Sequence, residues 1–195
     1  MFQFPNINPI ALDFGLVKIS WYALSYVAGI LTSWYLIIKI IKMKKIKISN
    51  KIVNELISNC MIGIILGGRL GYVTFYNPEY YFNNLMEIFK IWNGGMSFHG
   101  GLIGVILAII YSSRTLNIPI MLFSDLVAIV SPIGLFFGRI ANFINGELFG
   151  RVTNHHFGII FPNGGNLRRH PSQLYEAFFE GFVLFCIMIF FMNKS

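Results

Sequence analysis

Long apolar stretches separated by short polar links are the dominant pattern along this chain. Five stretches are each about as long as the ~20 residues that a helix needs to cross a membrane; they cover about 19–41, 52–76, 96–113, 119–145 and 172–192. None shows the period-two alternation of membrane-barrel strands, and only helices and closed barrels satisfy the backbone within lipid. The pattern therefore predicts an all-α, polytopic bundle of about five helices, forming one membrane domain over residues 1–195.

The composition supports the membrane class. Apolar residues make up 55% of the chain and charged residues 12%, about half the charged share of a soluble domain. This excludes a soluble enzyme, a disordered chain, a disulfide scaffold and a nucleic-acid-binding domain, so no nucleic-acid partner is expected. Cys60 and Cys186 lie in separate apolar stretches and form no C-x-x-C pair, which indicates neither a zinc site nor a redox pair.

The lysines predict the orientation of the bundle. Six of the nine lie in the link between the first two predicted helices, namely Lys39, Lys42, Lys44, Lys45, Lys47 and Lys51. Basic residues in short loops favour the cytoplasmic side, and drift toward AT-rich codons would have scattered them. Alternation then puts the N-terminus and the short link 146–171 outside and the C-terminus in the cytoplasm. Arg151, Arg168 and Arg169 in that outer link run against the rule, which indicates either a role for them or a short loop that tolerates them.

Glycines at four-residue spacing recur in three of the predicted helices. They are Gly63, Gly67 and Gly71 in the second, Gly100 and Gly104 in the third, and Gly134 and Gly138 in the fourth. Small residues at this spacing let membrane helices approach closely. The pattern predicts tight helix packing and by itself indicates no chemistry.

Ionisable residues within the predicted helices gather toward one depth. Each costs about 2.5–3.5 kcal/mol at the centre of a span on insertion scales, yet the chain keeps Arg69, His99, Arg139 and Glu176 toward the outer ends of their helices. Random drift would not gather them at one depth. They predict a polar pocket near the outer surface.

Helical spacing extends this pocket. Arg139 and Asn142 share a helix face at i and i+3, and the fifth helix repeats the pattern with Gln173, Glu176 and Glu180. Because the planar fork of arginine can bind two oxygens of a phosphate, the expected ligand is an anionic amphiphile such as a phospholipid, entering from the membrane.

Simpler interpretations stay open for single residues. Either Arg69 or Arg139 could be paired with an acidic neighbour, Glu147 or Glu176, without binding any ligand. His99 beside two glycines could be a packed histidine. His155 and His156 lack further ligands at suitable spacing, so no metal is expected.

Three longer motifs resemble those of the prolipoprotein diacylglyceryl transferase family. They are Met96-Ser97-Phe98-His99-Gly100-Gly101-Leu102-Ile103-Gly104, Gly138-Arg139 through Gly150-Arg151, and His170-Pro171-Ser172-Gln173-Leu174-Tyr175-Glu176. Trp21-Tyr22 and Gly67-Gly68-Arg69-Leu70-Gly71-Tyr72 also match in type and order. Because the motifs are long and occur in the family's order, the resemblance covers nearly the whole chain.

The resemblance implies a specific activity. The family transfers the diacylglyceryl group of phosphatidylglycerol to the lipobox cysteine thiol that follows a prolipoprotein signal peptide, leaving a thioether-linked lipid and glycerol phosphate. The reaction takes place in the bacterial inner membrane, a multi-pass setting, with the active site toward the outer face. Phosphatidylglycerol, prolipoproteins and membrane lipid are the expected partners, and no metal or cofactor is expected.

The resemblance also implies roles for residues. His99 is the candidate base for the thiol, whose ordinary pKa is about 8.5, although an arginine-lined field could also favour the thiolate. Arg139 would hold the phosphate and stabilise the leaving group. The other functional positions carried over are Tyr22, Asn142, Glu147 and Gly150, with Glu147 expected to orient Arg139; Arg69 and Glu176 are also expected to bind substrate.

The chain departs from the family pattern in two places. Family members usually continue past the fifth span with two more helices, the first with a Gly-Tyr-Gly-x-Phe-Arg motif, so we expect this chain to be a short form. The link that often forms a head domain is also short, and Arg168 or Arg169 is a candidate for the missing cation. Two alternatives to the transferase remain: a truncated non-catalytic relative and a small membrane transporter subunit.

Overall fold

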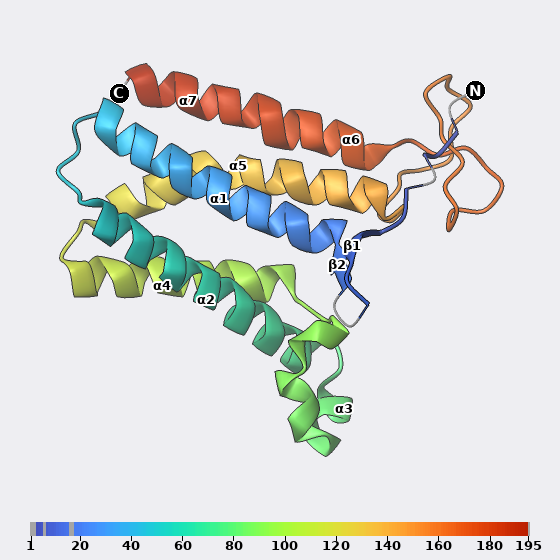
Figure 1. The fold of residues 1–195 in the computed structure, drawn as a ribbon, viewed down its shortest axis with the longest axis horizontal. Coiled ribbons are helices and arrows are strands. Elements are labelled where there is room, and N and C mark those ends of the chain that lie inside the picture. The colour runs from blue at the N-terminus through green and yellow to red at the C-terminus, as the bar shows by residue number, and fades with distance from the viewer. Residues whose placement is uncertain (1–2, 6, 16–17, 195) are drawn as a thin grey trace. The chain divides into compact units, whose positions relative to one another are not determined.

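The computed structural model describes residues 3–5, 7–15 and 18–194 (Figure 1). Among them five helices are long and apolar enough to cross a membrane: α1 (Trp21–Met43), α2 (Asn50–Phe75), α4 (Phe98–Leu116), α5 (Ile120–Ile144) and the continuous run Ser172–Lys194. The expected all-α, polytopic class is therefore confirmed, and each predicted span is found within a few residues of its expected ends.

The last span is not a uniform α-helix. It consists of α6 (Ser172–Glu176), a π-helical segment η3 (Ala177–Val183) and α7 (Leu184–Lys194). A Cβ added at Gly181 would lie 2.7 Å from Cβ of Phe136 and 2.9 Å from its Cα. The π segment therefore presents a glycine where the backbone of α5 passes, in keeping with the use of π-bulges at packing and functional positions.

Short elements that the apolar pattern did not predict lie in the links. β1 (Ile10–Asp13) and β2 (Lys18–Ser20) form a small antiparallel pair before α1. Between α2 and α4 come α3 (Pro78–Asn83) and the 3₁₀ turns η1 (Leu85–Phe89) and η2 (Ile91–Asn93). Such short elements depend on tertiary contacts rather than on a long apolar run.

The chain packs as two compact units. One comprises Met1–Ile37 and Val127–Ser195, and the other comprises Ile38–Leu126. Helices α1 and α5 are each continuous from one unit into the other, so the expectation of a single membrane domain stays a prediction.

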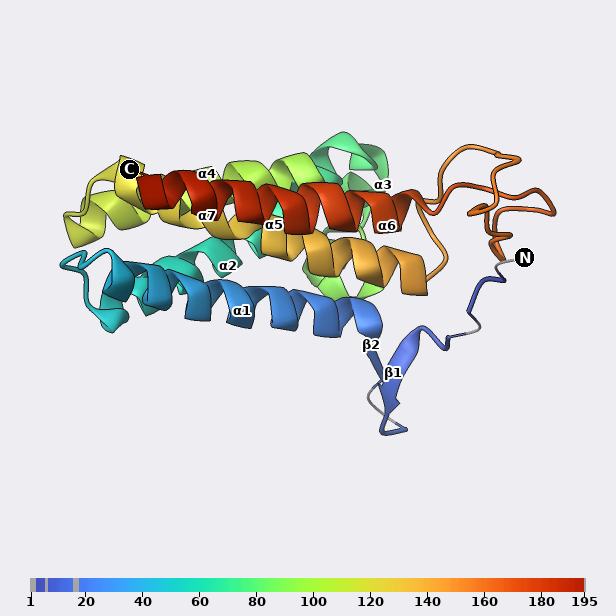
Figure 2. The same cartoon turned by 90° about the horizontal axis from the view of Figure 1, so that it is seen from above.

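Within the second unit, α2 and α4 lie side by side along a glycine seam (Figures 1 and 2). A Cβ added at Gly104 would lie 1.9 Å from the carbonyl oxygen of Gly63, and one at Gly67 would lie 2.3 Å from that of Gly100. No side chain fits between backbones at this separation. The predicted glycine packing is confirmed for these two helices.

The glycines of α5 behave differently. A Cβ added at Gly29 of α1 would lie 3.5 Å from Cα of Gly134, which is ordinary van der Waals contact. A Cβ added at Gly134 or at Gly138 would meet nothing within 4 Å in the described structure. Helix α1 therefore contacts the backbone of α5 at Gly134, whereas the predicted close approach at Gly138 is not found among the described residues.

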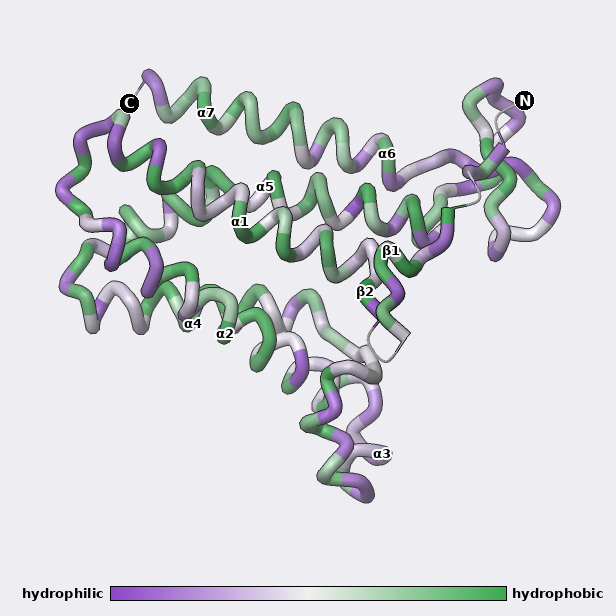
Figure 3. Tube along the Cα trace, viewed as in Figure 1, coloured by the Kyte–Doolittle hydropathy of each residue, from purple (hydrophilic) through white to green (hydrophobic). Residues whose placement is uncertain are grey.

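Apolar side chains cover the outer faces of the long helices. Large exposed apolar residues include Leu66 and Leu70 of α2, Ile103 of α4 and Phe190 of α7. Figure 3 shows the apolar colour along the helices, with much of the hydrophilic colour in the links. Exposed apolar surface of this extent marks a contact with lipid or with another protein.

Candidate functional site

In the first unit, Arg139 and Glu176 form an ion pair. Nε of Arg139 lies 2.7 Å from Oε2 of Glu176, and the two side chains are 29% and 31% exposed. Arg139 comes from the last two turns of α5 and Glu176 from the end of α6. Among the described residues Glu176 is the one polar partner of this guanidinium, and it takes Nε. The terminal nitrogens can therefore present the planar fork that binds two oxygens of a phosphate.

Glu147 contacts other residues than the one expected. Its Oε1 accepts hydrogen bonds from Nδ2 of Asn142 at 2.8 Å and from Nδ2 of Asn145 at 3.4 Å. The backbone N–H of Glu147 also donates to the carbonyl of Asn142 at 3.1 Å. The expectation that Glu147 orients Arg139 is thus not met: Glu147 holds Asn142, and Glu176 holds Arg139.

Gln173 links the fifth span to Glu147. Its Nε2 donates to the carbonyl oxygen of Glu147, and its side chain is fully buried. Its Oε1 is buried without a hydrogen-bond partner among the described residues. A buried amide oxygen without a donor is costly, so this contact lowers the stability of the unit unless a further donor reaches it.

Gly150 is enclosed by the segment that leads into α6. Its N–H donates to the carbonyl of His170 at 2.9 Å. An added Cβ would lie 2.1 Å from Oγ of Ser172 and 3.0 Å from the carbonyl oxygen of His170. The absence of a side chain at Gly150 therefore brings the second and third sequence motifs into contact.

Arg169 holds the 146–171 link together. Its Nε donates to the carbonyl of Gly164 at 3.0 Å, its Nη1 donates to that of Gly150 at 3.4 Å, and its guanidinium lies 5.0 Å from the centre of the Phe149 ring. The guanidinium of Arg169 thus has partners within the link. That Arg168 or Arg169 supplies the missing cation of the site stays a prediction.

Tyr22 lies in the first turn of α1, in the same unit. Its ring is half-buried and packs on Tyr26, with the ring centres 5.2 Å apart. No described interaction joins its side chain to Arg139 or to Asn142. Its role in the site therefore stays a prediction.

His99 belongs to the second unit, in the first turn of α4. Its ring is exposed and packs edge-on against Phe98, with the ring centres 5.6 Å apart. Ser97 caps this helix, since its Oγ accepts a hydrogen bond from the N–H of Gly100 at 3.2 Å. An exposed imidazole at the start of a capped helix differs from the buried, packed histidine of the simpler interpretation.

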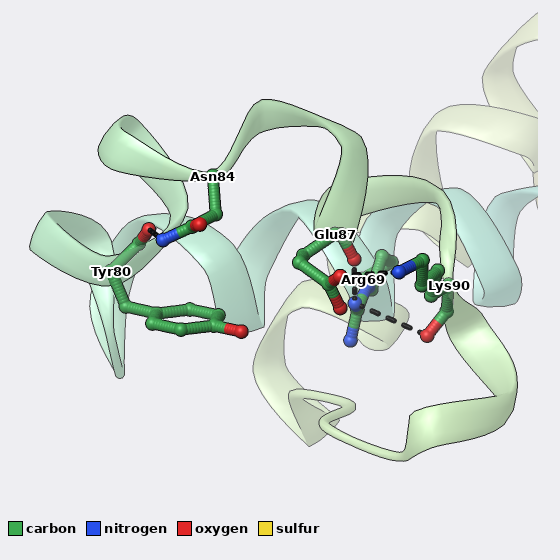
Figure 4. Close-up of polar contacts among 5 residues, drawn as sticks. All are labelled: Arg69, Tyr80, Asn84, Glu87 and Lys90. Carbon is green, nitrogen blue, oxygen red and sulfur yellow. Dashed lines mark hydrogen bonds and ion pairs between the residues drawn. The ribbon is translucent and has the colours of Figure 1, made fainter.

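Arg69, also in the second unit, is surrounded by backbone carbonyls. Its side chain is 4% exposed, and its guanidinium lies 5.1 Å from the centre of the Tyr81 ring. Five hydrogen bonds run from Nε to Ile88 (2.8 Å), from Nη1 to Gly94 (2.6 Å) and Gly95 (3.1 Å), and from Nη2 to Glu87 (2.5 Å) and Lys90 (3.3 Å). Figure 4 shows two of these partners, Glu87 and Lys90, around the guanidinium. Sequence reasoning missed these partners because backbone carbonyls leave no signal in residue types.

The predicted site residues line no described cavity and belong to no described metal-binding cluster. A depression of about 400 Å³ lies over Phe82–Glu87 in the second unit, and none of the predicted site residues lines it. Among the described residues no three His, Cys, Asp or Glu side chains cluster in a way that could hold a metal ion. A reaction without metal or cofactor stays a prediction.

Comparisons with known proteins agree on one family. A family model described as prolipoprotein diacylglyceryl transferase matches residues 9–195. Proteins of Rickettsia akari and Rickettsia felis, both named phosphatidylglycerol–prolipoprotein diacylglyceryl transferase, are 56% identical over 194 residues, which are 98% of this chain and 75% of each relative. A protein of the same name from Rickettsia bellii is 55% identical over 191 residues, or 98% of this chain and 73% of the relative.

Proposed function

Because the chain belongs to the prolipoprotein diacylglyceryl transferase family, we propose that it transfers the diacylglyceryl group of phosphatidylglycerol to the lipobox cysteine thiol of a bacterial prolipoprotein. The observation that carries the proposal is the 56% identity over 98% of the chain to proteins named for this reaction. At this similarity the substrates in the relatives' names, phosphatidylglycerol and a prolipoprotein, are those expected for this chain.

The reaction exchanges a carbon–oxygen bond for a carbon–sulfur bond. The cysteine sulfur attacks the carbon of the diacylglyceryl group that carries the phosphate ester. The bond from that carbon to oxygen breaks, and its electron pair leaves with glycerol phosphate. The thiol proton goes to a base, because the thiolate is the reactive form.

Arg139 is proposed to bind the phosphate and to stabilise the charge on the leaving glycerol phosphate. The ion pair with Glu176 supports this role, since it holds Nε and leaves the terminal nitrogens for the ligand. Asn142, held by Glu147, and Gly150 are proposed to complete the binding surface on the same unit.

His99 is proposed to be the base that takes the thiol proton. Its exposed ring in the first turn of α4 supports this role, since a base must reach a proton on a substrate that comes from outside. Tyr22, near the start of α1, is proposed to position the head group or the peptide.

The setting of the reaction is proposed to be the outer face of the bacterial inner membrane. Support comes from the six lysines of residues 39–51, at the end of α1, in the link that follows and at the start of α2, which favour the cytoplasmic side. Helices of alternating direction then bring the proposed site residues toward the opposite, outer side. The signal peptide of the prolipoprotein and the lipid would both reach such a site from the membrane.

The test is transfer by the intact chain. The purified chain in vesicles of phosphatidylglycerol is expected to add a diacylglyceryl group to a lipobox peptide, seen by mass, and to release glycerol phosphate in equal amount. His99→Ala and Arg139→Ala should abolish transfer, whereas Arg114→Ala, at the other end of α4, should not. The same variants are compared in a strain that lacks its own transferase.

Two outcomes would contradict the proposal. An intact chain that inserts normally but shows no transfer and no complementation would favour the non-catalytic relative. Solute flux through the vesicles, without transfer, would favour the transporter subunit.

A further inference from the structure

The Arg69 guanidinium has no hydrogen-bond donor left for an anion. A guanidinium carries five N–H groups, and five backbone carbonyls of residues 87–95 accept hydrogen bonds from them. The side chain is also 4% exposed and lies against the Tyr81 ring. Phosphate offers acceptors alone, so it would have to displace carbonyls that then lack a donor.

The carbonyls belong to the segment that leads directly into α4. This segment contains the consecutive glycines Gly94 and Gly95, both with a φ of +82°. At Gly95 an added Cβ would lie 2.5 Å from Cε1 of Tyr72, one turn after Arg69 on α2. Both the positive φ and the close ring therefore restrict this position to glycine.

Gly68, the residue before Arg69, binds Ser97, which lies two residues beyond this segment. The carbonyl of Gly68 accepts a hydrogen bond from the N–H of Ser97 at 2.8 Å. Ser97 is the capping residue of α4, and His99 lies two positions further on. Arg69 thus holds residues 87–95, and its neighbour Gly68 holds Ser97, two residues further along and next to the first turn of α4.

We propose that Arg69 is a positioning residue: its guanidinium does not bind substrate but fixes residues 87–95 on α2, and through them the first turn of α4 that carries His99. The inference rests on the proposed function, in which His99 takes the thiol proton. It replaces the expectation that Arg69 binds substrate, and it gives a buried cation in a membrane span a function that needs no ligand.

The first test measures the segment itself and needs no activity. Trypsin cleaves after Lys90, whose carbonyl is one of the five acceptors. In detergent, Arg69→Lys keeps the charge but has three N–H donors in place of five, so it should release the segment. Cleavage after Lys90 is expected to speed up by about tenfold or more, because proteolysis follows the population of the locally open form.

The same digest contains its own controls. Cleavage in the link between α1 and α2, after Lys44, and in the link after α5, at Arg151, should keep the rate of the unchanged protein. The matched variant Arg114→Lys alters an exposed arginine of α4 and should leave cleavage after Lys90 unchanged. Unchanged cleavage after Lys90 in Arg69→Lys would overturn the proposal.

The second test separates positioning from binding. If Arg69 positions His99, Arg69→Lys should lower kcat by about tenfold or more while KM for phosphatidylglycerol stays within about twofold. The acid limb of the kcat profile should also shift, because it reports the base in the complex. A raised KM with unchanged kcat would identify Arg69 as a phosphate ligand. A lowered kcat with an unchanged pH profile would reflect a smaller folded fraction, and either result would overturn the proposal.

The proposed transferase function and the positioning role of Arg69 can be disproved separately. If the unchanged protein shows no transfer, the proposed function fails, while the Lys90 digest still decides whether Arg69 fixes the segment. If transfer is normal and Arg69→Lys behaves like Arg114→Lys in both tests, the positioning role alone fails.

Discussion

The half-buried ion pair of Arg139 and Glu176 is the most telling contact at the scale of single residues. The Glu176 carboxylate contacts Nε of Arg139, so it orients the guanidinium and leaves the terminal nitrogens for a ligand. Arg69 is the opposite case, since backbone carbonyls occupy all of its donors. Two arginines in different motifs thus differ in their capacity to bind an anion, because their partners differ.

Replacing Glu176 by Gln tests the orienting role. The amide keeps the size of the side chain but removes the charge of a partly exposed ion pair, which is worth about 1 kcal/mol. Since 1.4 kcal/mol is a factor of ten, kcat/KM for transfer should fall by about fivefold to tenfold. Glu180→Gln is the matched control, because Glu180 lies in the same span, is exposed, and has no ion-pair partner among the described residues. Equal effects of the two variants would refute the role.

Replacing Gly150 by Ala tests the contact between two motifs. The new Cβ would meet Oγ of Ser172 at 2.1 Å and the carbonyl of His170 at 3.0 Å. We expect a loss of stability of about 1–3 kcal/mol, as in other overpacked sites, measured by thermal unfolding in detergent. Adding Ser172→Ala removes the nearer atom and should restore part of the loss; a double variant no better than the single one would mean that another contact is limiting.

At the scale of elements, the glycine seam between α2 and α4 places the helix that carries His99 against the helix that carries Arg69. Lipid provides no hydrophobic drive for helices to associate, so close backbone packing must hold the pair. The seam ends where the Gly68 carbonyl meets Ser97, which joins helix packing to the start of α4.

Two glycines of α4 give a matched test of the seam. Gly104→Ala would put a Cβ 1.9 Å from the Gly63 carbonyl oxygen, and it should lower the free energy of unfolding by about 1–3 kcal/mol. Gly101→Ala would put one 3.8 Å from the Ile64 carbonyl oxygen, in ordinary contact. Since Ala forms helix better than Gly by about 0.8–1.0 kcal/mol, Gly101→Ala should be neutral or slightly stabilising. Thermal unfolding in detergent measures both; equal stability of the two variants would contradict the seam.

At the scale of the whole molecule, the chain is a multi-pass membrane protein whose basic residues are unevenly distributed. Six lysines lie within residues 39–51, at the end of α1, in the link that follows and at the start of α2, while Arg151, Arg168 and Arg169 lie in the link after α5. The guanidinium of Arg169 has hydrogen-bond partners within that link, the carbonyls of Gly164 and Gly150.

The predicted orientation is open to labelling by a thiol reagent that does not cross membranes. After Cys60 and Cys186 are changed to Ala, a cysteine at Asn166 should react in intact cells. A cysteine at Lys44 should react only after permeabilisation, because its link is expected in the cytoplasm. The variant without cysteines is the control, and the reverse pattern would invert the topology.

Much of the fold and part of the candidate site could be predicted from residue patterns. The five spans were predictable because apolar length is a local property. The π segment near Gly181 and the turns of residues 78–93 were not, because their backbone follows contacts with Phe136 and Arg69. The partner of Arg139 was one of two open choices, and the alternative that paired it with Glu176 is the one observed.

The sequence by itself determined the membrane class, the number of spans and the family, since these depend on apolar length, residue type and the order of motifs. Only the tertiary structure decided which arginine keeps N–H donors for a ligand. Arg139 faces one carboxylate, whereas the donors of Arg69 are all occupied by five backbone carbonyls. The physical reason is that every residue has a carbonyl, so its position as an acceptor depends on how the chain folds back and not on which side chain it carries.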